Sequence, residues 1–170
     1  RAAADHPPSH GAAPANSVRR MIRDAEQIDV LPLAAIWYDG WRDAHFDLLP
    51  EALRHDRTPE RFAERLAAAL GDIRVAGGPG DPVGFYMLRG DELYQLYVAA
   101  RARGTGVAAG LIVDAERQLA AHGVGVAWLD CAIANDRAAR FYEKSGWHRM
   151  GEVVSNLTTP EGIVSIMVWR

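Results

Sequence analysis

The sequence has little cysteine, almost no lysine and no long apolar run. Cys131 is the only cysteine among the 170 residues, so an internal disulfide framework and a zinc site built from several cysteines are both excluded. No run of about 18 apolar residues occurs, so neither a membrane-spanning helix nor a membrane partner is expected. The formal net charge of −3 disfavours nucleic-acid binding through overall positive charge. We therefore expect a cytoplasmic globular protein without a metal.

The sequence changes character at about residue 17. Residues 1–16, RAAADHPPSHGAAPAN, contain almost no large apolar side chain, so we expect a flexible N-terminal tail there. The remainder, residues 17–170, has the length of one ordinary domain. Apolar residues make up 49% of the chain, which is enough to build a full core without disulfides.

Hydrophobic periodicity and turn signals predict the order of helices and strands in this domain. Thr58-Pro59-Glu60 is a typical helix start, because an N-cap residue is followed by proline. The expected strands cover residues 18–24, 73–76, 83–89, 93–98, 126–133, 147–155 and 163–169, and the expected helices cover residues 24–41, 49–53, 58–71, 104–121 and 135–145. The predicted class is α/β, more narrowly α+β, with a mixed, mostly antiparallel sheet of about seven strands and helices on both faces.

Arginine supplies nearly all of the positive charge. Of the 19 basic residues, 18 are arginine, and Lys144 is the only lysine. A GC-rich coding sequence would produce this bias without any functional reason. The alternative is that some guanidinium groups bind anions, because the planar guanidinium can hold a phosphate with two hydrogen bonds. Composition alone leaves both explanations open.

The clearest chemical signal lies in the loop between the strand expected at 93–98 and the helix that follows it. This loop contains Arg101, Arg103, Gly104 and Gly106. Glycine lets the backbone approach a ligand closely, and a helix N-terminus offers free N–H groups and a positive dipole end. The combination suits a pyrophosphate, although glycine also eases an ordinary strand-to-helix turn. No GxxxxGKS/T motif occurs, and the glycine spacing is one residue too long for a dinucleotide-binding GxGxxG.

Two segments resemble signature motifs of the GCN5-related N-acetyltransferase (GNAT) superfamily. Residues 103–108, RGTGVA, resemble the family's Q/R-x-x-G-x-G/A motif, and Leu96-Tyr97-Val98 resembles the strand before it. Asn135 opens the next helix, and residues 139–147, ARFYEKSGW, resemble the family's F/L-Y-E-K-x-G-F segment. Ala100 stands where many relatives have proline. The resemblance covers residues 17–170 and implies a GNAT-like sheet within a single acetyltransferase domain.

The resemblance also implies an acyltransferase that uses acetyl-CoA as co-substrate. A primary amine of a small molecule or peptide would attack the thioester directly in a ternary complex. Backbone N–H groups of the glycine loop would hold the pyrophosphate. The strand at 96–98 would splay from the strand at 126–133 and bind the pantetheine arm. A backbone N–H near Val98 would polarise the thioester carbonyl. The implied cofactor-binding residues are Leu96, Tyr97, Val98, Arg103, Gly104, Thr105, Gly106, Val107, Ala108 and Asn135.

Tyr142 lies in the second motif, where the resemblance implies a catalytic acid. A phenol can donate a proton to a departing thiolate, whereas the alternative is a tyrosine that only packs in the core. Asn135 also has two interpretations, because an asparagine before a helix caps it and can bind pantetheine as well. The general base stays open. Its candidates are Glu92, Asp43, His45, Asp39 and a chain of water molecules.

The acceptor is poorly specified by the sequence. Four acids in or near the first helix favour a cationic amine, although a solvated helix face explains them equally well; they are Asp39, Asp43, Asp47 and Glu51. Trp37 and Trp41 could line an acceptor pocket or form helix core. A second class of function is a non-catalytic acyl-CoA-binding or regulatory module of the same fold. The family resemblance also favours a homodimer, with the C-terminal strands as the interface.

Overall fold

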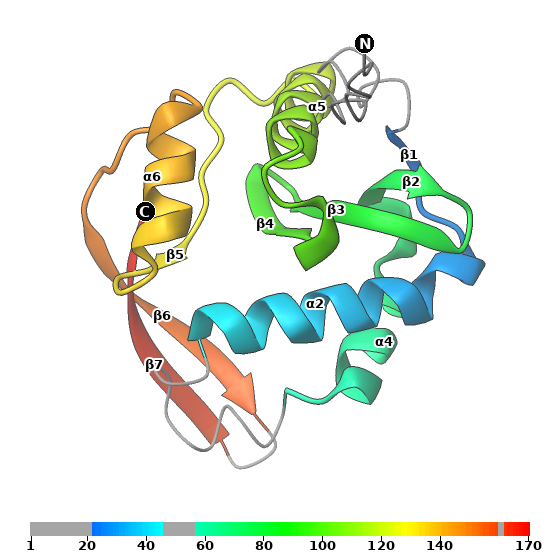
Figure 1. Cartoon of the computed structure of the whole chain (residues 1–170). Helices are drawn as coiled ribbons and strands as arrows, with labels where there is room; N and C mark the ends of the chain where they lie inside the picture. The colour runs from blue at the N-terminus through cyan, green and yellow to red at the C-terminus, as the bar shows by residue number, and fades with distance from the viewer. Residues whose placement is uncertain (1–21, 46–56, 160–161) are drawn as a thin grey trace, which may run out of the picture.

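The computed structural model describes residues 22–45, 57–159 and 162–170. These residues form seven strands in two sheets, with helices packed around them (Figure 1). The predicted mixed α and β class is therefore confirmed. The tail expected at 1–16 and the helix expected at 49–53 lie outside the described residues. Within the described ranges, no helix is both long and apolar enough to cross a membrane.

The larger sheet is an antiparallel meander that follows the order of the chain. It contains β1 (Ile22–Asp24), β2 (Ile73–Gly78), β3 (Asp81–Arg89) and β4 (Glu92–Val98), paired in the order β1-β2-β3-β4. Tight turns at Gly80 and Gly90 connect the last three strands, and both glycines have positive φ, of 74° and 60°. These strands confirm the three predicted in the middle of the sequence.

Helices cover both faces of this sheet. α2 (Val30–His45) and α4 (Pro59–Ala68) lie on one face, and α5 (Val107–Ala121) lies on the other (Figure 1). The alternation of side chains along β3 separates the two cores, because Phe85 packs with α2 and α4 whereas Tyr86 packs with α5. Thr58 caps α4 as predicted, since its hydroxyl accepts a hydrogen bond from the Arg61 N–H at 3.3 Å. Short 3-10 helices occupy Gln27–Asp29 (η1), Leu70–Asp72 (η2) and Ala100–Ala102 (η3).

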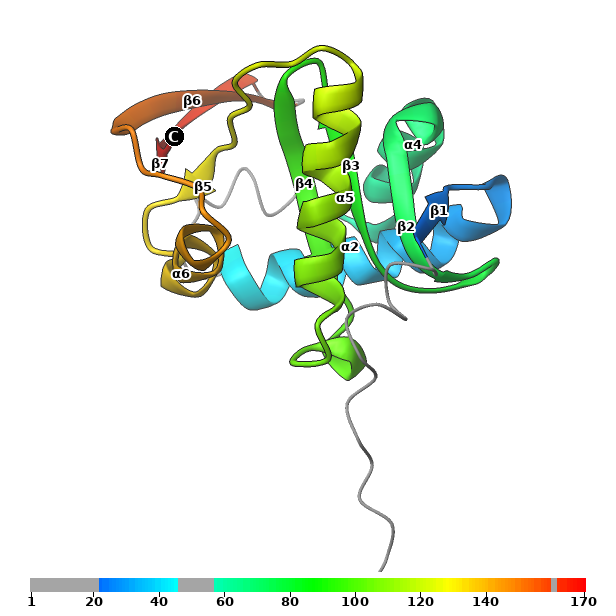
Figure 2. The ribbon, with the colours of Figure 1, turned by 90° about the horizontal axis from the view of Figure 1, so that it is seen from above.

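The smaller sheet contains the C-terminal part of the chain. Its strands are β5 (Cys131–Ala132), β6 (Glu152–Thr159) and β7 (Gly162–Trp169), paired antiparallel in the order β5-β7-β6. The helix α6 (Asp136–Lys144) connects β5 to the later strands. Seen from above, this sheet and α6 lie on one side of β4, and β1 to β3 lie on the other (Figure 2).

Two predicted strands are shorter than the sequence indicates. The strand expected at 126–133 is reduced to β5 and an isolated bridge at Trp128. Val126 is 83% exposed, so the apolar run does not enter the core as a continuous strand. The strand expected at 147–155 begins only at Glu152. The physical reason for the first difference is the lack of a continuous partner, because the segment before β5 meets β4 only at its start.

The backbone bridge at Trp128 joins the segment before β5 to the start of β4. The N–H of Leu93 donates to the Trp128 carbonyl at 2.9 Å, and the N–H of Trp128 donates to the Asp91 carbonyl at 3.2 Å. The bridge between Glu92 and Trp128 is parallel. Beyond it, no ladder joins β4 to β5 within the described ranges. The two edge strands therefore diverge, as the sequence resemblance implies, and a cavity opens between them.

Candidate functional site

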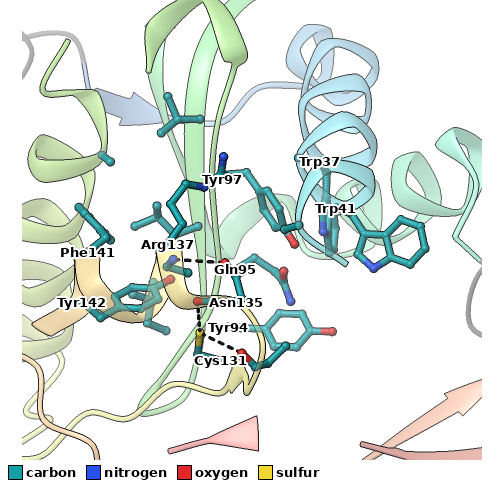
Figure 3. A pocket seen from close by; sticks show the side chains of 18 of the residues that line it. Trp37, Trp41, Tyr94, Gln95, Tyr97, Cys131, Asn135, Arg137, Phe141 and Tyr142 are labelled. Atoms are coloured by element: carbon teal, nitrogen blue, oxygen red, sulfur yellow. Dashed lines mark hydrogen bonds between the residues drawn. The ribbon is translucent and has the colours of Figure 1, made fainter. Parts of the chain in front are cut away.

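A cavity of about 590 Å³ lies between the diverging edges of β4 and β5. In Figure 3, Asn135 and Tyr142 approach from the α6 side, Tyr97 lies on β4, and Trp37 and Trp41 lie on α2. Most residues that the sequence singles out come together in its wall: Leu96, Tyr97, Val98, Arg103, Gly104, Gly106, Val107, Ala108, Asn135 and Tyr142. Thr105 does not line the cavity. Its hydroxyl donates to the Ala102 carbonyl at 2.6 Å and so stabilises the loop.

The glycine loop forms one end of the cavity and runs into α5. Gly104 and Gly106 have φ values of 76° and 88°, which side chains with a Cβ rarely adopt, and Gly106 is the N-cap of α5. Among the described residues, the N–H groups of Gly104, Gly106, Val107 and Ala108 donate to no backbone carbonyl. Free N–H groups at the positive end of a helix dipole make this loop suitable for an anion.

The two arginines of the loop point to different places. Arg103 lines the cavity, and its guanidinium donates to the carboxylate of Asp43 on α2 at 2.7 Å. Arg101 donates to the Asp81 carboxylate at 2.7 Å and to the Pro82 carbonyl at 2.9 Å, and it does not line this cavity. Arg101 therefore fastens the loop to the start of β3, and only Arg103 of the two is placed at the cavity.

The edge of β4 that faces the cavity carries free backbone groups. The N–H of Ala99 donates to the Val83 carbonyl of β3 at 2.9 Å. In an antiparallel pair, successive residues direct their N–H and carbonyl groups to opposite sides of the strand. The N–H groups of Leu96 and Val98 therefore point away from β3, toward the open edge. An extended ligand could pair with this edge as an additional strand would.

A β-bulge in the β3–β4 pair brings a further aromatic ring to the cavity. The register shifts between Met87 and Leu88 and leaves Tyr94 without a direct partner. Tyr94 and Tyr97 consequently both pack against the core that contains α2. Gly40 on α2 makes room for this packing, because a Cβ there would lie 2.5 Å from the ring of Tyr97. No sequence signal marks Tyr94, since a bulge breaks the alternation from which strand faces are predicted.

Tyr142 lies half-buried in the cavity wall, on α6. Its ring packs against Phe141 and Trp147, with centroid distances of 5.3 and 6.3 Å. No protein group among the described residues accepts or donates a hydrogen bond at its hydroxyl. Burial raises the pKa of this phenol well above its ordinary value, so the group stays protonated at neutral pH. A protonated, unengaged hydroxyl at a cavity can donate to a bound ligand.

Asn135 and Cys131 lie next to each other in the same wall. The Asn135 side chain accepts a hydrogen bond from the Ala138 N–H at 3.2 Å, so its N-cap role is confirmed. Its amide NH₂ remains available for a ligand, and the two roles are compatible. Cys131 is buried, and burial raises the pKa of its thiol to about 11. The thiol is therefore neutral at pH 7 and a poor nucleophile.

Among the candidate bases whose side chains the structure describes, Glu92 is the one that lines the cavity. It begins β4 and is 9% exposed. Burial is the main reason that the pKa of its carboxyl is raised. The negative charges of Asp130 and Asp91 raise this pKa further, whereas Arg89 and Arg170 oppose the rise. Such a carboxylate holds a proton more readily than an exposed one, which makes Glu92 a better proton acceptor than an exposed carboxylate.

Asp43 and Asp39 are placed less favourably. Asp43 pairs with Arg103, and Asp39 is exposed and does not line this cavity. His45 is the last residue of α2, and its side chain lies outside the described part of the structure. Asp47 and Glu51, which also favoured a cationic acceptor in the sequence, lie outside the described residues. Within the described part of the chain, the acids of the first helix thus give no support to a cationic acceptor.

Three further arginines line the cavity although no sequence motif indicates them there. Arg57 lies in the segment before α4, Arg65 lies on α4, and Arg137 lies in the first turn of α6. Arg137 is exposed and also lines the cavity. Across the described ranges, no group of three or more histidine, cysteine, aspartate or glutamate side chains could hold a metal ion.

The sequence is similar to one protein-family model and to several curated proteins. The acetyltransferase (GNAT) family model matches residues 31–147. An uncharacterized N-acetyltransferase of Mycobacterium tuberculosis is 40% identical over 92 residues, or 51% of this chain and 59% of that protein. A probable N-acetyltransferase of the same species is 29% identical over 140 residues, covering 75% and 79%. The chain thus spans 59% of the length of the first curated relatives that it matches.

Solved structures share the fold. A GCN5-related N-acetyltransferase from Rhodopseudomonas palustris has a TM-score of 0.66 at 25% identity, with coverage of 87% of this chain and 92% of that one. The PaiA N-acetyltransferase from Thermoplasma acidophilum, solved in complex with coenzyme A, has a TM-score of 0.58 at 18% identity, with coverage of 88% and 96%. The second likeness concerns the fold alone.

Proposed function

The chain belongs to the acetyltransferase (GNAT) family, and we propose that it transfers the acetyl group of acetyl-CoA to a primary amine. One observation carries the proposal. The cavity between β4 and β5 joins the free N–H groups of the glycine loop to the protonated hydroxyl of Tyr142. The relatives named as N-acetyltransferases support the same activity.

Binding of acetyl-CoA uses three parts of the cavity. The free N–H groups of the loop at 104–108 hold the pyrophosphate at the positive end of α5. The open edge of β4 at Leu96 and Val98 pairs with the amide groups of the pantetheine arm. Asn135 adds its amide NH₂ to that arm while it continues to cap α6. Arg137 is exposed at the same cavity and contributes positive charge toward a phosphate.

The reaction then requires two proton transfers and one stabilised oxygen. The amine nitrogen attacks the thioester carbon, so that a C–N bond forms and the C–S bond breaks. An edge N–H near Val98 stabilises the negative charge on the carbonyl oxygen. Tyr142 gives its proton to the leaving thiolate and regains one from solvent. Glu92 accepts the proton of the amine through water, because at about 3.3 Å per residue it starts β4 well away from Val98.

A non-catalytic acyl-CoA-binding module is the competing function. Tyr142 favours catalysis, since its hydroxyl lies at the cavity and no described residue forms a hydrogen bond with it. The two functions separate in one experiment, in which free thiol release from acetyl-CoA is measured with a panel of amines and products are identified by mass spectrometry. We expect acetylated amine and equimolar thiol. Binding of coenzyme A in calorimetry, without turnover of any amine, would favour the module.

A further inference from the structure

The end of the cavity near the start of β4 contains positive charge that acetyl transfer itself does not use. Arg57 and Arg65 both line the cavity, and Arg65 binds the hydroxyl of Tyr94, near the start of β4. Their charges both lower the pKa of the Tyr97 phenol, against the larger effect of burial, which raises it to about 12. Two guanidinium groups thus act on one ring in the cavity wall. Neither is marked by the family motifs.

Arg65 is held among aromatic rings. Its guanidinium lies 4.5 Å from the centre of the Trp37 ring and 5.9 Å from the centres of the Phe62 and Tyr94 rings. One of its N–H groups donates to the Tyr94 hydroxyl. No carboxylate in the described part of the chain lies within ion-pair distance of Arg65, although Arg61 on the same helix pairs with Glu64 at 3.0 Å.

This positive group is separate from the loop proposed to hold the pyrophosphate. Tyr94, which binds Arg65, lies near the start of β4, and the glycine loop follows its end. Tyr94 lies four residues before the end of β4, which at about 3.3 Å each is roughly 13 Å of strand before the loop begins. The phosphate groups at the loop are therefore too distant to be the counter-ion of Arg65. Since no carboxylate of the described residues pairs with Arg65 either, this end of the cavity is suited to a second anionic group.

A partly buried guanidinium without a carboxylate partner is costly, and a bound anion removes that cost. Its planar set of donors matches a carboxylate, which it can hold with two hydrogen bonds. The amine of such an acceptor has to reach the thioester near Val98, and aromatic rings lie between Arg65 and that point. The Trp37 ring lies 4.5 Å from the Arg65 guanidinium and 6.3 Å from the ring of Tyr97, the residue before Val98, so these rings suit an apolar body. On the basis of the acetyl transfer proposed above, we propose that the acceptor is an amine that carries a carboxylate, of the kind found in apolar amino acids.

The test compares acids with their neutral amides as acceptors. Phenylalanine, tyrosine and leucine are each assayed with acetyl-CoA beside the corresponding amino-acid amide, and putrescine represents cationic amines. In the wild type, we expect a kcat/KM for at least one acid about 10-fold above that of its amide. Arg65→Met should lower kcat/KM for the acid by about 10- to 100-fold, mostly through KM, and change the amide by less than about 2-fold, as expected for lost charge-assisted hydrogen bonds.

Two further variants make the result specific. Arg61→Met removes an exposed arginine of the same helix that does not line the cavity, and it should leave the preference for the acid unchanged. Arg65→Lys keeps the charge and should retain part of the preference if Arg65→Met fails to fold. Calorimetric titration with coenzyme A should give the same affinity for all folded variants.

The outcomes separate the two proposals. Turnover of amides or putrescine in preference to every acid would overturn the carboxylate acceptor and leave acetyl transfer intact. Equal losses for acid and amide in Arg65→Met would also overturn it, because Arg65 would then only pack. No thiol release with any amine, while coenzyme A still binds, would overturn acetyl transfer itself.

Discussion

Replacing Tyr142 with phenylalanine removes one oxygen from the cavity wall and little else. The ring contacts with Phe141 and Trp147 stay, and no hydrogen bond to a described residue is lost. A positioned general acid contributes at least about 100-fold, so we expect kcat to fall about 100-fold, which corresponds to about 2.7 kcal/mol of activation free energy. The unfolding free energy should change by less than about 0.5 kcal/mol, because no partner is left unsatisfied.

The assay measures thiol release at saturating acetyl-CoA, with affinity for coenzyme A from calorimetry. Tyr38→Phe is the matched control, since Tyr38 lies on α2 and packs against the core but does not line the cavity. The wild-type rate should not fall between about pH 7 and pH 9 through loss of the Tyr142 proton, because burial raises the pKa of that phenol. An unchanged kcat in Tyr142→Phe would refute its role as acid, as would a loss of kcat fully explained by weaker coenzyme A binding.

Two other groups give predictions with a defined dependence on pH. Glu92→Gln should lower kcat/KM about 100-fold at neutral pH. In the wild type, kcat/KM should rise with pH on the acidic side of the profile as the Glu92 carboxyl ionises, at a pH above its ordinary pKa, and the mutant should lose this rise. A mutant that keeps the rise would exclude Glu92 as the base. Asp29 is fully buried, accepts two hydrogen bonds from Arg23 at 2.7 and 2.8 Å, and has its pKa lowered to about 2, mainly by Arg23. Its folded pKa lies below its unfolded one, so about 2 kcal/mol of stability is present above about pH 4 and is lost toward pH 2. Asp29→Asn should flatten this dependence in urea denaturation, and an unaltered pH dependence would contradict the assignment.

The sequence predicts most of the larger sheet because local signals determine it. Tight turns at Gly80 and Gly90 fix two hairpins, and the Thr58-Pro59 pair fixes the start of α4. The loop at 103–108 and the helix that begins after Asn135 are also local features, and each carries its own motif. The loop follows β4 and the helix follows β5. Both therefore reach the same cavity, because it lies between the diverging edges of these two strands.

The rest depends on contacts between distant segments. The apolar run at 126–133 has the composition of a buried strand, but whether it pairs depends on where the two sheets part. Arg101 and Arg103 are two residues apart, and their different partners, Asp81 and Asp43, come from β3 and α2. Arg65 reaches the cavity only because α4 packs beside α2 and a bulge turns Tyr94 toward it. Periodicity along one segment contains no information about such neighbours.

The most direct test of the account is a crystal structure of the chain with coenzyme A. The account predicts pyrophosphate oxygens within hydrogen-bond distance of the N–H groups of the loop at 104–108, with the pantetheine arm along the open edge of β4. The thiol should lie within hydrogen-bond reach of the Tyr142 hydroxyl. A pyrophosphate bound away from this loop, or a thiol placed out of reach of Tyr142, would contradict it.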